Sequence, residues 1–105
     1  MDILIGDVLK SIRKCSGITQ AKFAKEIHVS QSYISKLEKN ETSPNIEVLD
    51  LYANFFEIEP ELILKFRNLK DHNSLSQKIR IVLFRKLMDN ANNEHFEGKD
   101  ERNTI

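Results

Sequence analysis

Apolar residues of the segment 4–66 recur every three or four positions, as they do along helices that bury one face. Leu4, Val8 and Ile12 predict a first helix over 4–15, and Gly17 suits its end because glycine readily takes a left-handed conformation. Short polar breaks then separate four further apolar stripes, over 20–27, 30–39, 45–56 and 59–66. The pattern therefore predicts an all-α domain of five helices.

The boundaries of these helices carry residues suited to helix ends. Thr19, Ser30 and Asn45 each precede an apolar stripe, and we expect their side-chain oxygens to cap the helix that follows. Pro60 fits the first turn of the fifth helix, where its missing N–H is not needed. Asn40 follows the third helix at a position that requires a left-handed residue, a conformation that asparagine tolerates.

The chain beyond residue 66 follows a different pattern. Residues 67–73 are polar and predict a linker, and Ser74 and Gln77 form a capping-box pattern that opens a sixth helix over 74–90. Apolar residues cover more than one stripe of this helix, which is too much for a helix lying on the surface of one small domain. From 91 to 105 the composition is polar and charged, and we expect disorder.

Size and residue counts narrow the class of protein. A chain of 105 residues suits one domain, here 1–66, with an appendage, and leaves no room for a separate catalytic domain. The single cysteine, Cys15, excludes an internal disulfide, and the three histidines are scattered. We therefore expect no metal, no cofactor and no enzymatic activity. Without a signal peptide or a membrane-length apolar stretch, a cytoplasmic, nucleoid-associated location is expected.

The formal net charge of zero hides a banded distribution. Between residues 10 and 39, seven lysines and arginines stand against two glutamates, whereas every charge between 41 and 61 is acidic. Between 67 and 86 the chain is basic again. A basic band attracts phosphate and hence nucleic acid, although solvated helix faces alone can produce the same pattern.

Two of the predicted helices, 20–27 and 30–39, are joined by only His28 and Val29. A helix pair with such a tight turn is typical of helix-turn-helix proteins, but many other all-α proteins contain one. The segments 19–24 (TQAKFA) and 29–38 (VSQSYISKLE) make the pattern more specific. Together with Pro44 and Phe56 they resemble the Cro and phage-repressor (lambda-repressor-like, XRE) helix-turn-helix family over residues 5–66.

This resemblance implies operator binding, with the helix 30–39 in the major groove of double-stranded DNA. Base contacts are expected from four outward side chains: Gln31, Ser32, Ser35 and Lys36. Contacts to the DNA backbone are expected from a second set: Gln20, Lys22, Ser30, Tyr33, Lys39 and Thr42. For Tyr33 the alternative is packing against its own domain.

The resemblance also implies a structural ion pair between Arg13 and Glu38, so Arg13 is not counted as a DNA contact. The sequence departs from the family at two positions where glycine is usual, now His28 and Asn40. Both residue types are among the few that tolerate a positive φ.

A symmetric homodimer on an inverted repeat is the usual assembly that the resemblance implies. We expect the sixth helix to supply the dimer surface, with help from the fifth, through Leu62, Phe66, Leu75, Ile79, Val82, Leu83 and Leu87. The alternative is that this helix folds back on its own domain. The predicted function is a transcriptional regulator, most simply a repressor. The competing hypothesis is a protein-interaction adaptor or an antitoxin that binds a partner protein through the last helix.

Overall fold

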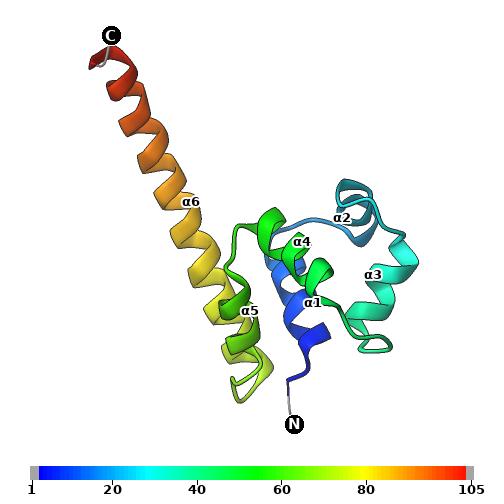
Figure 1. Ribbon diagram of the computed structural model, residues 1–105. Coiled ribbons are helices and arrows are strands. Elements are labelled where there is room, and N and C mark those ends of the chain that lie inside the picture. The colour runs from blue at the N-terminus through cyan, green and yellow to red at the C-terminus, as the bar shows by residue number, and fades with distance from the viewer. Residues whose placement is uncertain (1–2, 104–105) are drawn as a thin grey trace.

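The computed structural model describes the backbone of residues 3–103 and the side chains of residues 3–89. Within that range the chain forms six helices and no strand (Figure 1), which confirms the all-α prediction. The helices are α1 (Ile5–Cys15), α2 (Gln20–Glu26), α3 (Gln31–Glu38), α4 (Ile46–Phe56), α5 (Pro60–Phe66) and α6 (His72–Asn103).

Side-chain caps begin α2, α3 and α4 where the sequence predicted them. The hydroxyl of Thr19 accepts a hydrogen bond from the backbone N–H of Lys22 at 3.1 Å, and that of Ser30 accepts from Tyr33 at the same distance. The carboxamide oxygen of Asn45 accepts from the N–H of Val48 at 2.8 Å. These bonds satisfy N–H groups that a helix leaves without an internal partner.

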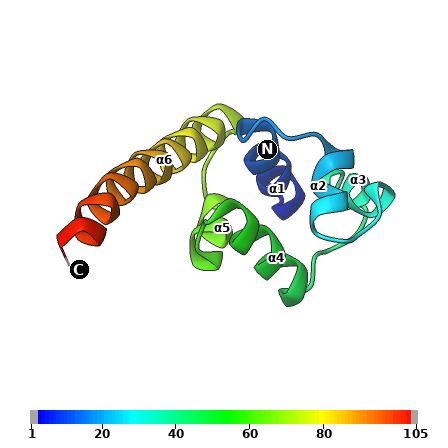
Figure 2. The same ribbon diagram turned by 90° about the horizontal axis from the view of Figure 1, so that it is seen from above.

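The core is built around α1, which packs against α3, α5 and α6. Its residues Val8, Leu9 and Ile12 are fully buried. Phe23 joins α2 to α4, because its ring lies 4.7 Å from that of Tyr52 and 5.0 Å from that of Phe56. Seen from above (Figure 2), α2 and α3 lie on one side of α1, and α6 extends away on the other.

Close backbone approach joins the start of α1 to the end of α3. The N–H of Gly6 donates to the carboxamide oxygen of Asn40 at 2.8 Å, and Asn40 donates in turn to Asp7 at 3.3 Å. A Cβ at position 6 would collide with the carbonyl oxygen of Leu37, so this contact requires glycine. Asn40 has a φ of 62° and therefore ends the helix in the expected left-handed conformation while its side chain binds α1.

The start of α6 differs from the prediction. The helix begins at His72, and its cap is Asp71, whose carboxylate accepts a hydrogen bond from the N–H of Ser74 at 2.8 Å. That hydrogen bond lowers the pKa of the Asp71 carboxyl. The preceding segment 67–71 is shorter than the expected linker, and its Leu69 packs against the core.

The first half of α6 lies against its own domain, which corrects part of the predicted dimer surface. Leu75 and Ile79 are fully buried and Phe66 is 4% exposed, so these three side chains fill the core of the single chain. Leu62, Val82 and Leu83 are partly buried against the same core. The alternative of folding back therefore holds for this half of the helix.

The second half of α6 leaves the domain (Figure 1). Among the described side chains of α6 as a whole, four large apolar ones are exposed: Ile81, Phe84, Leu87 and Met88. The helix continues to Asn103, whereas we expected disorder from residue 91. Residues 104 and 105 of the expected tail, and residues 1 and 2, lie outside the described range.

Candidate nucleic-acid interface

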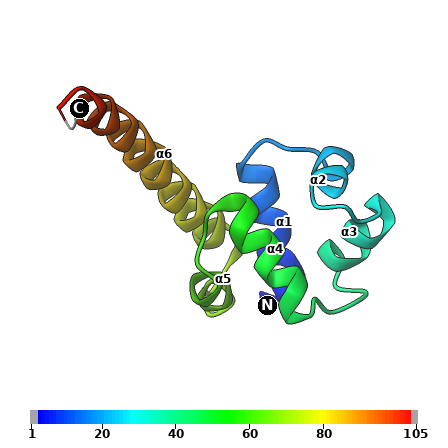
Figure 3. The same cartoon turned by 45° about the horizontal axis from the view of Figure 1, so that its top comes forward.

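Helices α2 and α3 form a tight pair at the end of the molecule opposite α6 (Figure 3). Between them His28 takes a φ of 62°, the left-handed conformation that reverses the chain, and the N–H of Val29 donates to the carbonyl of Ala24 at 3.0 Å. Ile27 is buried beneath this turn. The pair is thus held rigidly on the core, as a helix that reads DNA needs to be.

The two faces of α3 have opposite character. Ile34 and Leu37 are fully buried and fix the helix to the domain. On the other face Gln31, Ser32 and Lys36 are exposed. Ser35, the fourth side chain expected to contact bases, is half-buried at the edge of this face. The structure therefore brings the predicted base-contacting residues to one side of one helix.

The residues expected to hold the DNA backbone are placed less uniformly. Lys22, Ser30 and Lys39 are exposed, and the Ser30 oxygen already accepts the capping hydrogen bond of α3. Thr42 is half-buried in the loop that follows α3. Tyr33 is half-buried and packs against the core of its own domain, which is the alternative position considered for this residue.

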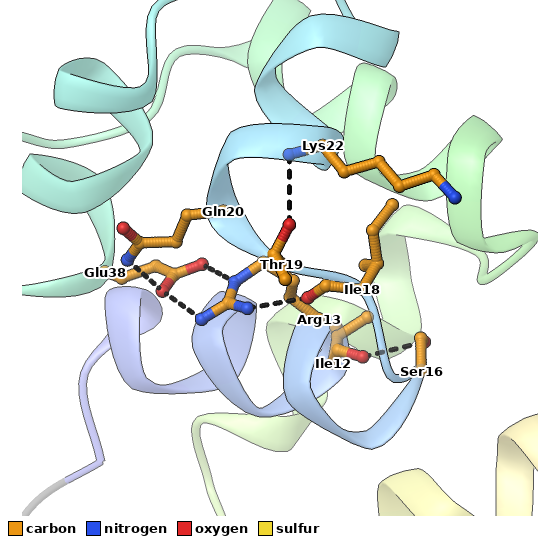
Figure 4. A network of polar contacts seen from close by, with 8 residues as sticks. All are labelled: Ile12, Arg13, Ser16, Ile18, Thr19, Gln20, Lys22 and Glu38. Atoms are coloured by element: carbon orange, nitrogen blue, oxygen red, sulfur yellow. Dashed lines mark hydrogen bonds and ion pairs between the residues drawn. The ribbon is translucent and has the colours of Figure 1, made fainter.

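An ion pair buried beneath the helix pair links α1 to α3 (Figure 4). The Nε of Arg13 donates to Oε2 of Glu38 at 2.6 Å, and its Nη2 donates to Oε1 at 3.0 Å. A third bond runs from Nη1 to the carbonyl of Ile18 at 2.7 Å. Side-chain exposure is 9% for Arg13 and 1% for Glu38, so the expected structural pair is present and its charges are shielded from solvent.

Gln20 has a contact that sequence reasoning missed. Its side-chain Nε2 donates to Oε1 of Glu38 at 2.9 Å (Figure 4). The two residues stand 18 positions apart, and nothing in the spacing of the chain pairs them. Gln20 was expected to contact the DNA backbone, and in the structure one end of its amide is bound to the ion pair.

Tyr52 is the other polar group beneath this region. Its hydroxyl is buried, and no hydrogen-bond partner for it lies among the residues that the structure describes. Burial raises the pKa of the Tyr52 hydroxyl well above its usual value, and the nearby Glu38 carboxylate raises it further. The group therefore stays neutral, which is consistent with a role in packing.

The charge bands of the sequence become separate surfaces. Exposed lysines gather on α2 and α3 and at their ends: Lys22, Lys25, Lys36 and Lys39. Among the acids of this region, Glu38 is buried and paired, whereas Glu26 at the end of α2 and Glu41 after α3 are exposed. The exposed acids of α4 and the turn into α5 are Glu47, Asp50, Glu57, Glu59 and Glu61. With four exposed lysines against the exposed Glu26 and Glu41, the helix pair and its ends carry an excess of positive charge even though the whole chain is neutral.

Within residues 3–103, no helix has an apolar stretch of the length needed to span a membrane. Among the described side chains, no group of three or more His, Cys, Asp or Glu residues gathers where it could hold a metal ion.

Comparison with known proteins agrees with this geometry. The helix-turn-helix family profile matches residues 9–63, just over half of the chain. The chain belongs to the XRE-type helix-turn-helix family. The matched span includes all of α2 and α3, so the family assignment rests on the helix pair described above. It makes the protein a member of a family of DNA-binding regulators.

Two named relatives fall in the same family. An immunity repressor protein of Bacillus phage phi105 is 25% identical over 103 residues, covering 90% of this chain and 72% of the repressor. Antitoxin PezA of Streptococcus pneumoniae is 30% identical over 82 residues, covering 75% of this chain. The matched part is about half of the antitoxin, 52% of its length. No solved structure matches the chain.

Proposed function

We propose that this protein is a sequence-specific transcriptional regulator, most simply a repressor, that places α3 in the major groove of an operator. The observation that carries this proposal is the exposed polar face of α3, held on the core by two fully buried side chains, Ile34 and Leu37. This anchoring holds the polar face in one orientation, as recognition of base edges requires. The phage repressor relative supports the same function.

The side chains of this face suit base recognition. A glutamine can make two hydrogen bonds with adenine, and a lysine can donate to the O6 and N7 atoms of guanine. Gln31 and Ser32 stand in the first turn of α3, where side chains of a recognition helix reach base edges first. Lys36 stands one turn later. Lys22 and Lys39 flank the helix pair and would meet phosphates.

We further propose that the protein acts as a symmetric homodimer, because one recognition helix reads few base pairs. The surface we assign to the second copy is the outer side of α6, where the exposed apolar side chains lie. Ile81, Phe84 and Met88 follow the alternating spacing of three and four residues that is typical of a seam between two helices.

The distribution of apolar residues on α6 favours a second copy. Its own domain buries Leu75 and Ile79 on one side, and the opposite side still carries Phe84, which is 62% exposed. A helix that is apolar on both sides needs a cover on both sides. A copy of the same helix, related by a two-fold axis, has the same self-complementary seam and places the two reading helices symmetrically.

Selection of bound duplexes from a random pool, followed by titration in a gel-shift assay, tests the DNA-binding function. We expect an inverted-repeat sequence whose half-sites lie about 34 Å apart, or about one helical turn. Affinity should fall steeply between low and high salt. Equal affinity for selected and random duplexes would contradict the proposal, as would the absence of any DNA binding.

Sedimentation of the full chain tests the dimer. Phe84→Asp and Met88→Asp should shift the protein from dimer to monomer, because each puts a charge into the apolar seam. Asn54→Asp, at an exposed position of α4, is the matched control and should leave the dimer intact. A wild-type protein that sediments as a monomer in the presence of its operator would exclude this assembly.

The antitoxin relative favours a second candidate function, in which the exposed side of α6 binds a different protein. In that case Phe84→Asp would leave the oligomeric state unchanged and abolish binding of the partner. Either function would place the protein in the cytoplasm, and DNA binding would associate it with the nucleoid.

A further inference from the structure

Gln20, Glu38 and Arg13 form a chain of hydrogen bonds that begins half-exposed at the helix pair and ends in the core (Figure 4). Gln20 is the first residue of α2, Glu38 the last of α3, and Arg13 belongs to α1. Oε1 of Glu38 accepts two of these bonds, from Gln20 at 2.9 Å and from Arg13 at 3.0 Å. The chain thus connects the recognition helix to the side chain expected to meet phosphate.

This contact selects one orientation of the Gln20 amide. An ionised carboxylate only accepts hydrogen bonds, so Glu38 binds the NH2 end of the amide and repels the carbonyl end. The NH2 group has two hydrogens, and Glu38 occupies one of them. The other is left for an acceptor outside the protein, and Gln20 is only half-buried. A flipped amide would instead turn its carbonyl oxygen toward the carboxylate.

Arg13 makes an acid tolerable at this place. A carboxylate facing DNA would normally repel the phosphates. The guanidinium of Arg13 binds both carboxylate oxygens and is itself fixed by the carbonyl of Ile18. The planar guanidinium group donates to both carboxylate oxygens at once, which the ammonium group of a lysine does not do in the same geometry. The negative charge of Glu38 is therefore compensated while its oxygen stays available to Gln20.

We propose that Glu38, held by Arg13, is a positioning residue for DNA binding: it orients the Gln20 amide so that one N–H points at a backbone phosphate. Glu38 itself does not touch DNA, because its side chain is 1% exposed. The role rests on the proposed DNA-binding function. It assigns to the buried ion pair a part in recognition in addition to its part in the fold.

A double-mutant cycle on a selected duplex tests the proposal. In the wild-type background Gln20→Ala should weaken binding about tenfold, the effect of losing one hydrogen bond to a charged group. In the background Arg13→Met with Glu38→Leu, which replaces the pair by apolar side chains of similar size, the same substitution should change affinity by less than about twofold. Lys22→Ala, outside the network, is the control and should have the same effect in both backgrounds.

Equal effects of Gln20→Ala in the two backgrounds would overturn the positioning role and leave DNA binding itself standing. If the wild type binds no duplex at all, the proposed function fails first. The two failures are therefore distinguishable in one set of titrations.

A measurement on the unmodified protein covers the case in which the double variant does not fold. The side-chain amide of Gln20 should show a high 15N heteronuclear NOE, as a group held in one orientation does on the picosecond to nanosecond timescale. The amide of exposed Gln31 is the internal control and should be mobile. Equal mobility of the two amides would overturn the proposal.

Discussion

Helix α3 and the last helix α6 use their surfaces in opposite ways. Helix α3 buries Ile34 and Leu37 and turns a polar side to solvent. Helix α6 buries Leu75 and Ile79 and still exposes Phe84 and Leu87. Both are fixed to the same core, yet one offers hydrogen-bonding groups and the other offers apolar area. The two proposed partners match this difference, because polar side chains can read base edges and exposed apolar ones are typical of protein contacts.

The largest effect is expected where α6 is buried. Ile79→Ala should lower the free energy of unfolding by about 3 kcal/mol, because it leaves a cavity in the core. The matched substitution is Leu87→Ala, on the same helix. Leu87 is 64% exposed, so this change should leave the stability of the monomer nearly unchanged. Chemical denaturation at low protein concentration measures both. Equal losses would show that the two sides of α6 do not differ as described.

The polar side of α3 gives the second prediction. Gln31→Ala should weaken binding to the selected operator about tenfold or more and relax the preference at one base pair, with no change in stability. Gln77→Ala, an exposed glutamine on α6, serves as the control and should leave affinity unchanged. Titration against the operator and its single-base variants provides the measurement. A loss that is uniform across all duplexes would reassign Gln31 to the DNA backbone.

The two left-handed residues on either side of α3 allow a smaller, paired test. His28 and Asn40 both have a φ of 62°, but only the Asn40 side chain is known to bind α1. His28→Gly should therefore raise stability by about 0.5 kcal/mol, because glycine relieves the left-handed strain. Asn40→Gly should lower it by about 1 kcal/mol, because the buried N–H of Gly6 loses its acceptor. Thermal unfolding of the two variants gives the signs, and equal signs would contradict this account.

The cap of α6 adds the smallest effect, and it depends on pH. Folding lowers the pKa of Asp71 through its bond from the Ser74 N–H, so its stabilising contribution is present above the unfolded value of 3.8 and is lost as pH falls through the folded value. Asp71→Asn retains a capping oxygen without titrating. The wild type should be the more stable protein at neutral pH, and this difference in melting temperature should disappear in acid. A difference that does not vary with pH would exclude Asp71 as a charged cap.

Much of the helix-turn-helix region was predictable because local rules decide it. The three predicted capping side chains, Thr19, Ser30 and Asn45, all act as caps in the structure, since a cap bonds to residues only three positions away. The left-handed conformation of Asn40 was predictable from its residue type and position. The cap of α6 was misplaced: the capping-box pattern predicted a start at Ser74, whereas in the structure the carboxylate of Asp71, three residues earlier, caps the helix.

The sequence by itself determined the all-α class, the faces of α3 and the presence of the Arg13–Glu38 pair through its family pattern. Only the tertiary structure decided which side of α6 is covered by its own domain and which side stays free. It also decided that the amide of Gln20 binds Glu38 and that α1 requires glycine at position 6. The physical reason is the same in each case. Helical periodicity shows which face of a helix is apolar, and residue type shows which side chains can form hydrogen bonds. Which residue each of them contacts is decided by packing between segments that are distant in the chain.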